Sequence, residues 1–348
     1  MLFRSAKCGK VLRFNGRQLN KENLLGSQCD ALFVRSTTRI DSKLLEGTNV
    51  RFVGTATSGI DNVDVDYIKE KNIFFANAPG SNSNSVAEYV LFSILKWSFQ
   101  NKVELTGKTI GVVGYGNIGK IVARYAQYMG LKVLINDPPL KENRFPFPNY
   151  CKYNELNQLL SEADIITNHI PLTNDGFYPT YNLFNDQNIR LLKNNSLFIH
   201  ASRGGVVCER ALLNKFDISG ITIVADVFEN EPLVNKELVE KSLLATPHIA
   251  GYSFDGKIRG TKAMAFAFQK YYKIEPDMTV IDRLISEYIP LDEEKFRYYS
   301  FIYELLKNSR NLDDDFDGFL QTMKFDDITR AKSFDYLRKN YKKRREVL

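Results

Sequence analysis

Three kinds of polar residue that together can oxidise a hydroxy acid follow apolar runs in the second half of the chain. Arg203 follows Ser196–Ala201, a pair of glutamates follows Thr222–Ala225, and His248 follows Leu243–Ala245. A guanidinium can hold a carboxylate through two hydrogen bonds, and an imidazole can accept the hydroxyl proton as a hydride leaves. A carboxylate beside the imidazole orients the ring and stabilises its protonated form. These segments therefore predict a site for hydride transfer from an anionic hydroxy acid.

The residue types leave two of these assignments open. Glu229 and Glu231 both follow the same apolar run, and their spacing does not choose between them. Of the three histidines, His200 lies inside an apolar run and is expected in the core. His169 fits either a structural role or a place beside a cofactor, so His248, next to a turn that contains glycine, is the best candidate base.

The positions of these residues along the chain predict that they converge. In a sheet of parallel strands, ligands bind beyond the carboxyl ends of the strands, and each of these residues follows such an end. Asp226, which directly follows Thr222–Ala225, belongs to the same set. Gly204 and Gly205 beside Arg203 allow the backbone to approach a ligand closely.

A glycine-rich turn between a strand and a helix is the strongest sign of a cofactor site. The expected elements are a strand Thr109–Val113, the turn Gly114-Tyr115-Gly116-Asn117-Ile118-Gly119, a helix to about Met129, and a strand Lys132–Asn136 that ends at Asp137. Gly114 permits the tight turn, Gly116 lets the backbone approach a pyrophosphate, and Gly119 lets the helix pack on the strand. Asp137 can bind a ribose diol and repels a 2′-phosphate, which predicts NAD rather than NADP. Taken alone, Asp137 also fits a simple helix cap.

Strands that alternate with helices surround this turn. Strands are expected at 31–35, 50–54 and 73–76, and helices at 85–99 and 255–272. Such alternation indicates an α/β protein with parallel sheets and crossover helices. The helix 85–99 is apolar on most faces, which predicts burial between domains.

The composition limits the class of protein. With 348 residues, of which 44% are apolar, the chain is expected to form two or three domains. The net charge of +6 is explained by an anionic substrate or a basic tail, and no nucleic acid is predicted. The four cysteines form no C-x-x-C pair, so neither disulfides nor a metal site are expected. The most apolar run, Val86–Leu95, is too short to span a bilayer, which together with the polar start predicts a cytoplasmic protein without a membrane partner.

The motifs GYGNIG, ASRGG, DVFENEP and TPHIAG, which lie in this order between about Ala31 and Tyr272, resemble those of the D-isomer-specific 2-hydroxyacid dehydrogenases. The resemblance implies that Arg203, Glu231 and His248 are catalytic, which favours Glu231 over Glu229. It implies cofactor contacts for Gly114, Gly116, Asn117, Ile118, Gly119, Asp137, Ile170, Ser202, Asp226 and Gly251. It implies substrate contacts for Ser36, Thr57 and Tyr252. Ile170 replaces an expected threonine, so its contact would rest on backbone or apolar packing.

The resemblance also implies an arrangement of three domains. Residues 1–84, completed by a helix at 255–273, would form a flavodoxin-like substrate domain. Inserted into it, residues 85–254 would form a Rossmann domain with a doubly wound parallel sheet that binds NAD. Residues 274–348 resemble an additional α+β dimerisation domain found in members that oxidise a phosphorylated four-carbon hydroxy acid. The implied partners are therefore NAD, such an acid and a second copy of the chain.

Two parts of the chain depart from this pattern or extend it. The family begins with a strand and a helix, whereas MLFRSAKCGK is expected to start within that helix, so the first strand is absent. The basic tail contains Arg338, Lys339, Lys342, Lys343, Arg344 and Arg345. Most of these are expected on a solvated helix face. A sharper hypothesis is that Arg338 or Arg344 reaches a substrate phosphate in a partner subunit, with Arg35 and Ser36 as alternative phosphate ligands.

Two alternative functions fit parts of the sequence. The chain could act on phosphoglycerate, glycerate or lactate, and its dimerisation-type tail with GYSFDGKIRGT argues against this. A non-catalytic NAD-sensing scaffold is the second alternative. The complete set of Arg203, Glu231 and His248 argues against it, because a sensor has no need of these groups.

Overall fold

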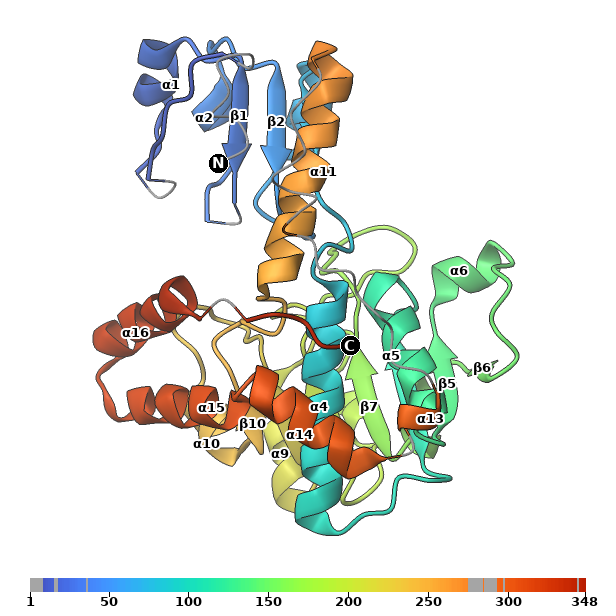
Figure 1. Cartoon of the computed structure of the whole chain (residues 1–348). Helices are drawn as coiled ribbons and strands as arrows, with labels where there is room; N and C mark the ends of the chain where they lie inside the picture. Colours follow the sequence, from blue (N-terminus) through green and yellow to red (C-terminus); the bar gives the residue numbers. More distant parts are fainter. Residues whose placement is uncertain are drawn as a thin grey trace. The chain divides into compact units, whose positions relative to one another are not determined.

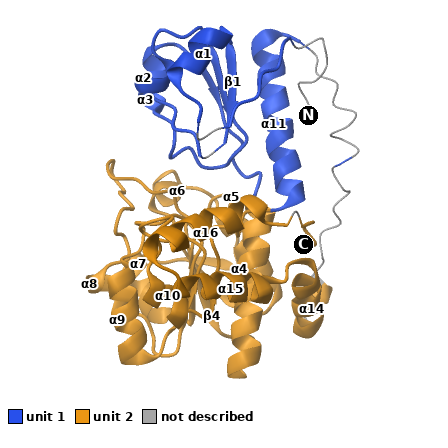
Figure 2. Cartoon of the chain, turned by 90° about the vertical axis from the view of Figure 1, so that its left-hand side faces the viewer, with its two compact units in different colours: residues 1–82, 253–287 blue, residues 83–252, 288–348 orange. Residues whose placement is uncertain are grey.

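The computed structural model describes residues 9–15, 18–35, 37–274, 284, 293–296, 298–342 and 344–348. The chain forms two compact units (Figure 2). Unit 1 contains residues 1–82 and 253–287, and unit 2 contains residues 83–252 and 288–348. The segment 253–287 thus returns to the unit in which the chain begins.

A parallel sheet of seven strands forms the centre of unit 2 (Figure 1). Its strands are β4 (Thr109–Val113), β5 (Lys132–Asn136), β6 (Cys151–Tyr153), β7 (Ile165–Asn168), β8 (Leu197–His200), β9 (Thr222–Ala225) and β10 (Leu244–Ala245). The order β10-β9-β8-β7-β4-β5-β6 is that of a Rossmann fold with one further strand at the edge. The strand order reverses between β4 and β7, and in such sheets ligands bind at this point. The predicted α/β class and Rossmann sheet are confirmed.

Apart from the edge strand β6, the strands of unit 2 are buried on both faces, as expected for a parallel sheet covered by helices. Successive residues of β5 belong to different cores, because side chains alternate across a strand. Val133 and Ile135 pack in one core, and Leu134 packs in the other. The helices around the sheet are α4 (Ser83–Asn101), α5 (Asn117–Tyr128), α6 (Pro138–Glu142), α7 (Leu156–Glu162), α8 (Asp186–Ile189), α9 (Glu209–Ser219) and α10 (Lys236–Lys241).

The C-terminal segment, residues 288–348, packs on this sheet rather than forming a unit of its own. Its helices are α13 (Glu293–Phe296), α14 (Tyr299–Ser309), α15 (Leu312–Gln321), the short 3₁₀ helix η2 (Thr322–Lys324) and α16 (Asp327–Asn340). Ile302 and Leu306 of α14 are buried in one core of the sheet, and Phe319 and Phe334 are buried in the other. These apolar side chains explain why the expected boundary at residue 274 does not separate the segment from unit 2. Its described residues form helices and no strand, so the predicted α+β character is not observed there.

Helix α4 is buried along most of its length, from Ser83 to Ser98. The sequence predicts burial between domains, but the neighbours of α4 are α5 and α14 of its own unit. An example is Phe92 of α4, whose ring stacks on Tyr303 of α14 at 5.3 Å between centroids. The C-terminal segment thus covers the face of α4 that would otherwise be exposed.

Unit 1 contains a smaller parallel sheet with the strand order β1-β2-β3. Its elements are α1 (Lys21–Ser27), β1 (Ala31–Val34), α2 (Ser42–Leu45), β2 (Phe52–Thr55), α3 (Val65–Glu70), β3 (Phe74–Ala76) and α11 (Phe254–Tyr272). Helix α11 packs on β2 and β3. The rings of Phe52 and Phe268 lie 5.8 Å apart at this contact, which explains why the segment after residue 252 belongs to unit 1.

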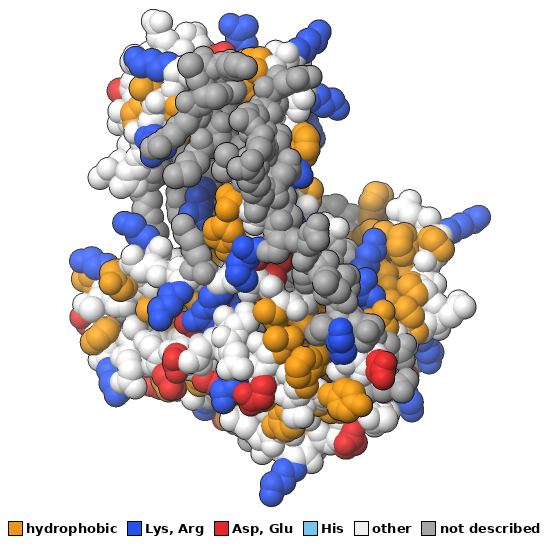
Figure 3. Space-filling view, viewed as in Figure 1, with side chains coloured by type: hydrophobic (Ala, Val, Ile, Leu, Met, Phe, Trp, Pro, Cys, Tyr) orange, Lys and Arg blue, Asp and Glu red, His pale blue; other side chains and the backbone are white. Residues whose placement is uncertain are grey.

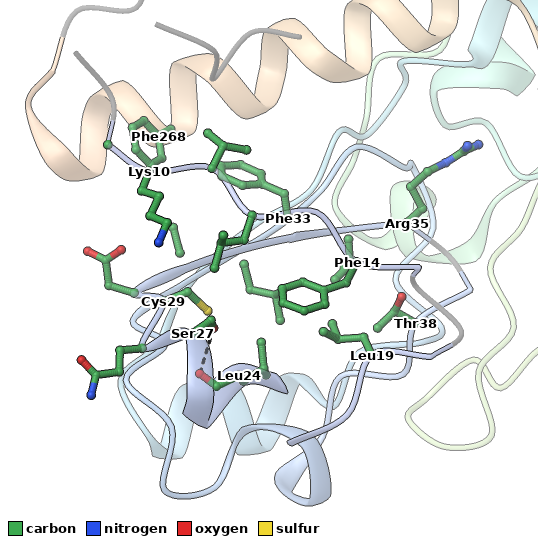
Figure 4. Close-up of a pocket in the computed structure, with 18 of the residues that line it drawn as sticks. Lys10, Phe14, Leu19, Leu24, Ser27, Cys29, Phe33, Arg35, Thr38 and Phe268 are labelled. Atoms are coloured by element: carbon green, nitrogen blue, oxygen red, sulfur yellow. Dashed lines mark hydrogen bonds between the residues drawn. The ribbon is translucent and has the colours of Figure 1, made fainter. Parts of the chain in front are cut away.

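The start of the described chain differs from the prediction. Residues 9–15 adopt no regular structure, so the helix expected at the beginning is not observed there, and residues 1–8 lie outside the described part. The predicted flavodoxin-like sheet is represented by three strands in the described residues. A cavity of about 930 Å³ is lined by consecutive residues of β1 and by Leu12, Phe14 and Phe268 (Figure 4). The edge of unit 1 at this point is therefore hollow.

Within the described residues, none of the helices combines the length and the apolar character needed to cross a membrane.

Candidate active site

His248 and Glu231 form a hydrogen-bonded pair at the carboxyl edge of the seven-stranded sheet. His248 Nδ1 lies 2.8 Å from Glu231 Oε2. The side chains are 29% and 20% exposed, so solvent reaches the pair without surrounding it. Glu231 is itself oriented, because its Oε1 accepts a hydrogen bond of 3.1 Å from the amide of Phe228. With Nδ1 engaged, Nε2 is the ring nitrogen that can exchange a proton with a bound molecule.

The structure distinguishes the two glutamates that the residue types left open. Glu229 Oε1 accepts a hydrogen bond of 2.9 Å from the amide of Glu209, at the start of α9. Glu209 Oε1 in turn accepts a hydrogen bond of 2.7 Å from the amide of Glu229. Burial raises the pKa of Glu209 to about 7. Glu229 therefore belongs to a contact with the start of α9, and Glu231 is the partner of His248.

Asp226 organises the segment that follows His248. Its carboxylate accepts hydrogen bonds from the amides of Ile249 and Ala250, at 2.7 and 3.0 Å, and from the hydroxyl of Thr246 at 2.7 Å. Burial raises the pKa of Asp226 despite these hydrogen bonds. The predicted cofactor residue Asp226 thus acts in this structure on the loop that carries His248.

The other two histidines have environments that keep them neutral. Burial lowers the pKa of His200 to about 3, and its Nδ1 lies 3.3 Å from Asn168 Oδ1. Burial also lowers the pKa of His169 to about 3, and its Nε2 lies 3.0 Å from Thr167 Oγ1. The expectation of a core position for His200 is confirmed. Neither residue is suited to take up a proton near neutral pH.

Arg203 lies on the loop that follows β8. Its Nη1 donates a hydrogen bond of 2.8 Å to the carbonyl of Ser202. The hydroxyl of Ser202 donates to Asn168 Oδ1, which ties this loop to the end of β7. A Cβ atom at Gly204 would lie 1.9 Å from the carbonyl oxygen of Phe228. The close approach that the sequence predicts at Gly204 is therefore to a neighbouring loop, the one that also carries Glu231, rather than to a ligand.

The glycine-rich turn has the form that a dinucleotide requires. Gly114 has a φ of 90°, and a Cβ there would lie 2.8 Å from the carbonyl oxygen of His169. A Cβ at Gly119 would lie 2.0 Å from the carbonyl oxygen of Gly114. Gly116, the N-cap of α5, faces open space and leaves the first amides of the helix without a side-chain cap. Such amides at Asn117, Ile118 and Gly119 suit a pyrophosphate.

Asp137 stands at the end of β5, where the carboxylate that binds a ribose is expected. One of its oxygens accepts a hydrogen bond of 2.8 Å from the amide of Tyr115, and the other accepts one of 3.1 Å from the amide of Leu140 in α6. The capping role that the sequence left open is thus observed. It also fixes the carboxylate beside the glycine-rich turn, where it can accept further hydrogen bonds.

Ile170 packs directly against this turn. Its Cγ2 would lie 2.7 Å from a Cβ at Gly114, so the two residues are in close contact. The observed contact of Ile170 is thus apolar packing against Gly114 of the turn, and its contact with a cofactor stays a prediction. Gly251 lies in the turn after His248, closed by a hydrogen bond of 2.8 Å from the amide of Tyr252 to the carbonyl of Ile249.

We expect the turn to respond differently to substitutions at Gly119 and Gly116. Gly119→Ala places a methyl group against a backbone oxygen, and the overpacking should cost about 2 kcal/mol and lower the melting temperature by about 5 °C. Gly116→Ala is the matched control, because its methyl group enters open space. This variant should keep its melting temperature while losing NAD affinity, as measured by calorimetric titration. Equal melting temperatures for the two variants would contradict the assignment.

The predicted substrate residues are distributed over both units. Tyr252 belongs to unit 2, and its hydroxyl accepts a hydrogen bond of 3.5 Å from Nη2 of Arg338. Thr57 belongs to unit 1, where its hydroxyl donates to the carbonyl of Gly59 at 3.0 Å. Ser36 lies outside the described residues. The substrate roles of Ser36, Thr57 and Tyr252 stay predictions.

Two arginines of the C-terminal segment join this site within one chain. Arg338 Nη1 lies 4.0 Å from Glu231 Oε2, and Arg310 donates to carbonyls of the His248 loop. The sequence favours a solvated helix face for most of the basic tail, with a partner's phosphate as the sharper hypothesis for Arg338, whereas in the structure Arg338 lies beside Glu231 of its own chain. Arg310 was not predicted at all, because it carries no local motif and follows an ordinary amphipathic helix. Arg344 instead pairs with Asp315 at 3.1 Å.

Comparison with known proteins agrees with this geometry. Residues 92–250 match the family model described as D-isomer specific 2-hydroxyacid dehydrogenase, NAD binding domain. The D-lactate dehydrogenase of Aquifex aeolicus, solved with NAD and lactic acid, has a TM-score of 0.60 and 26% identity over 74% of this chain and 86% of that one. The 3-phosphoglycerate dehydrogenase of Entamoeba histolytica shares the fold, with a TM-score of 0.61 and 24% identity over 73% and 83% of the chains.

The fold, the glycine-rich turn and the His248–Glu231 pair define an NAD-dependent dehydrogenase of the 2-hydroxyacid class. The erythronate-4-phosphate dehydrogenase of Wigglesworthia glossinidia brevipalpis is 38% identical over 98% of this chain and 88% of its own length. That of Azotobacter vinelandii is 36% identical over 97% and 88%. The chain belongs to the erythronate-4-phosphate dehydrogenase family.

Proposed function

We propose that the chain catalyses the NAD-dependent oxidation of 4-phospho-D-erythronate to 2-oxo-3-hydroxy-4-phosphobutanoate, a step in the synthesis of pyridoxal 5′-phosphate, in the cytoplasm. The observation that carries the proposal is the 2.8 Å contact between His248 Nδ1 and Glu231 Oε2, beside the loop of Arg203. The family relationship over almost the whole chain supports the substrate.

His248 and Glu231 divide the proton chemistry between them. When bound, NAD supplies the acceptor for the hydride that leaves C2. His248 Nε2 accepts the proton of the C2 hydroxyl, and Glu231 stabilises the resulting imidazolium through Nδ1. Because Glu231 is held by the amide of Phe228, little reorientation is needed as the charge develops.

Arg203 and Arg338 are the cations assigned to the anionic ends of the substrate. A guanidinium at Arg203 holds the carboxylate in two hydrogen bonds and favours the developing C2 carbonyl. Arg338, which contacts the hydroxyl of Tyr252, is the candidate for the phosphate within the same chain. This revises the hypothesis that Arg338 or Arg344 reaches a substrate phosphate in a partner subunit. Arg344 pairs with Asp315, and Arg338 contacts residues of its own unit.

The function is tested by the formation of NADH from NAD and 4-phosphoerythronate, followed by absorbance. A panel of erythronate, 3-phosphoglycerate, glycerate and lactate is measured with it. We expect the highest kcat/KM for 4-phosphoerythronate and a much lower value for erythronate, which lacks the phosphate. A preference for another acid of the panel would keep the class of enzyme and overturn the proposed substrate.

We further propose that the chain forms a homodimer through the C-terminal segment. Large apolar side chains of this segment are exposed, and Figure 3 shows hydrophobic side chains over α14. Phe301 of α14 is 52% exposed, and Ile218 of α9, at 83%, offers a control outside the segment. In sedimentation equilibrium, Phe301→Glu should reduce the mass toward the monomer's 39.9 kDa, whereas Ile218→Glu should not. A wild-type mass of one chain would refute the dimer.

A further inference from the structure

A buried arginine from the C-terminal segment forms hydrogen bonds with the loop that carries His248. Arg310 lies between α14 and α15, and its side chain is 2% exposed. Its Nη2 donates to the carbonyl oxygens of Ile249 and Ala250, at 3.3 and 3.0 Å. Its Nη1 donates to the carbonyl and the hydroxyl of Ser85 in α4. One guanidinium thus joins the C-terminal segment, α4 and the loop after His248.

The same two residues of the loop are also held from their other side. Asp226 accepts hydrogen bonds from the amides of Ile249 and Ala250, while Arg310 binds their carbonyls. Both polar groups of these consecutive residues are therefore fixed by charged side chains. His248 directly precedes them and has a φ of 54°, a left-handed conformation that few residues other than glycine adopt without support. The hydrogen bonds that follow it supply such support.

Residues of α4 and the C-terminal end of the chain hold the arginine in place. Glu88 Oε2 lies 4.0 Å from Arg310 Nη1, and Glu88 Oε1 accepts a hydrogen bond of 2.8 Å from the amide of Leu348. The C-terminal end therefore lies beside α4, as Figure 1 shows. The hydroxyl of Ser85 adds a hydrogen bond of 2.7 Å to the carbonyl of Ala250.

The burial of the Arg310 guanidinium indicates a role beyond filling space. A buried guanidinium is costly unless its donors are satisfied, and apolar residues of similar size often stabilise a core at least as well. A side chain that only filled space at this position would have no need of a charge. The fork of donors in an arginine can instead hold several carbonyls in fixed positions at once.

We propose that Arg310 is a positioning residue for the dehydrogenase reaction. It fixes residues 249–250 so that His248 Nδ1 stays within hydrogen-bond distance of the Glu231 carboxylate. The C-terminal segment then completes the active site of its own chain in addition to any part in assembly. The activity measurements below rest on the proposed function, so a second measurement without substrate accompanies them.

The test compares Arg310→Met and Arg310→Lys with the control Arg330→Met. Arg330 is also largely buried in the C-terminal segment, at 11% exposure, but it pairs with Asp327. A misplacement of about 1 Å in an active site costs about 100-fold in rate, so we expect Arg310→Met to lose about 100-fold in kcat. Arg310→Lys should recover part of this loss, and Arg330→Met should keep the wild-type kcat. Affinity for ADP-ribose, which lacks the nicotinamide, should change by less than about threefold in all three, since the glycine-rich turn is untouched.

Hydrogen exchange of the loop distinguishes failure of this inference from failure of the proposed substrate. In Arg310→Met without substrate, the amides of Ile249 and Ala250 should exchange at least about tenfold faster, whereas those in α5 should not change. If Arg310→Met does not fold, Ser85→Ala, which removes one hydroxyl contact to Arg310 and one to Ala250, is measured instead. Unchanged exchange at these amides would overturn the inference, as would a kcat loss equal to that of Arg330→Met.

Discussion

A His248→Gln variant is expected to lose about 10³-fold in kcat while binding NAD as tightly as the wild type. Acid and base groups of enzymes typically contribute 10²- to 10⁴-fold, and His248 is the histidine that pairs with a carboxylate at the edge of the sheet. Burial lowers the pKa values of His169 and His200 to about 3, so neither can take over its function near neutral pH. Initial rates with 4-phosphoerythronate and calorimetric titration with NAD measure the two quantities.

Glu231→Gln and Glu229→Gln provide a matched pair of controls for this result. Glu231→Gln removes the charge that stabilises the imidazolium, and kcat should fall by about 10- to 100-fold. Glu229→Gln alters the contact with the start of α9, which should cost about 1 kcal/mol of stability and leave kcat nearly unchanged. The assignment of His248 and Glu231 would be wrong if Glu229→Gln lowered kcat and Glu231→Gln did not. It would also be wrong if His248→Gln retained normal turnover.

An Arg203→Met variant should lose about 10³-fold in kcat/KM for 4-phosphoerythronate. Each hydrogen bond to a charged group contributes about 1.5–3 kcal/mol, and the proposed grip on the substrate carboxylate contains two of them. Arg203→Lys keeps the charge without the planar fork, so its kcat/KM should lie between those of the methionine variant and the wild type.

Arg210→Met is the control for Arg203. Arg210 lies nearby in the sequence, pairs with Asp186 and is 70% exposed, so its loss should change kcat/KM by less than about twofold. Affinity for NAD should be unaffected in both variants. A normal kcat/KM for Arg203→Met would show that another residue binds the substrate carboxylate.

Much of the cofactor site could be predicted from local sequence. The strands Thr109–Val113 and Lys132–Asn136 have the expected bounds, because continuous apolar runs flanked by glycine and charge leave few alternatives. The glycines of the turn are required by backbone contacts that involve residues close in sequence or on the adjacent strand. The form of the turn could therefore be predicted from its own residues, although one contact that requires Gly114 comes from the end of the adjacent strand.

The pairing of the proposed catalytic groups depended on tertiary structure. Glu229 and Glu231 are nearly equivalent in sequence, and only the fold of the loop after β9 directs one to α9 and the other to His248. Family resemblance chose Glu231, and the hydrogen bonds give the physical reason for that choice.

The C-terminal segment shows the limit of local patterns most clearly. The family resemblance implies a separate domain for its helices. Periodicity could not correct that expectation, because it reports that a face is apolar and not what covers it. In the structure Ile302, Leu306 and Phe319 are buried in the cores of the Rossmann sheet.

The α/β class and the glycine-rich turn could be predicted from the sequence, since both depend on short-range spacing, and family resemblance added Arg203, Glu231 and His248 as candidate catalytic residues. Tertiary structure alone decided that Arg310 and Arg338 from the end of the chain reach the loop of His248 and the carboxylate of Glu231. Contacts between residues so far apart are fixed by the packing of helices on a sheet, and no local pattern of residues encodes that packing.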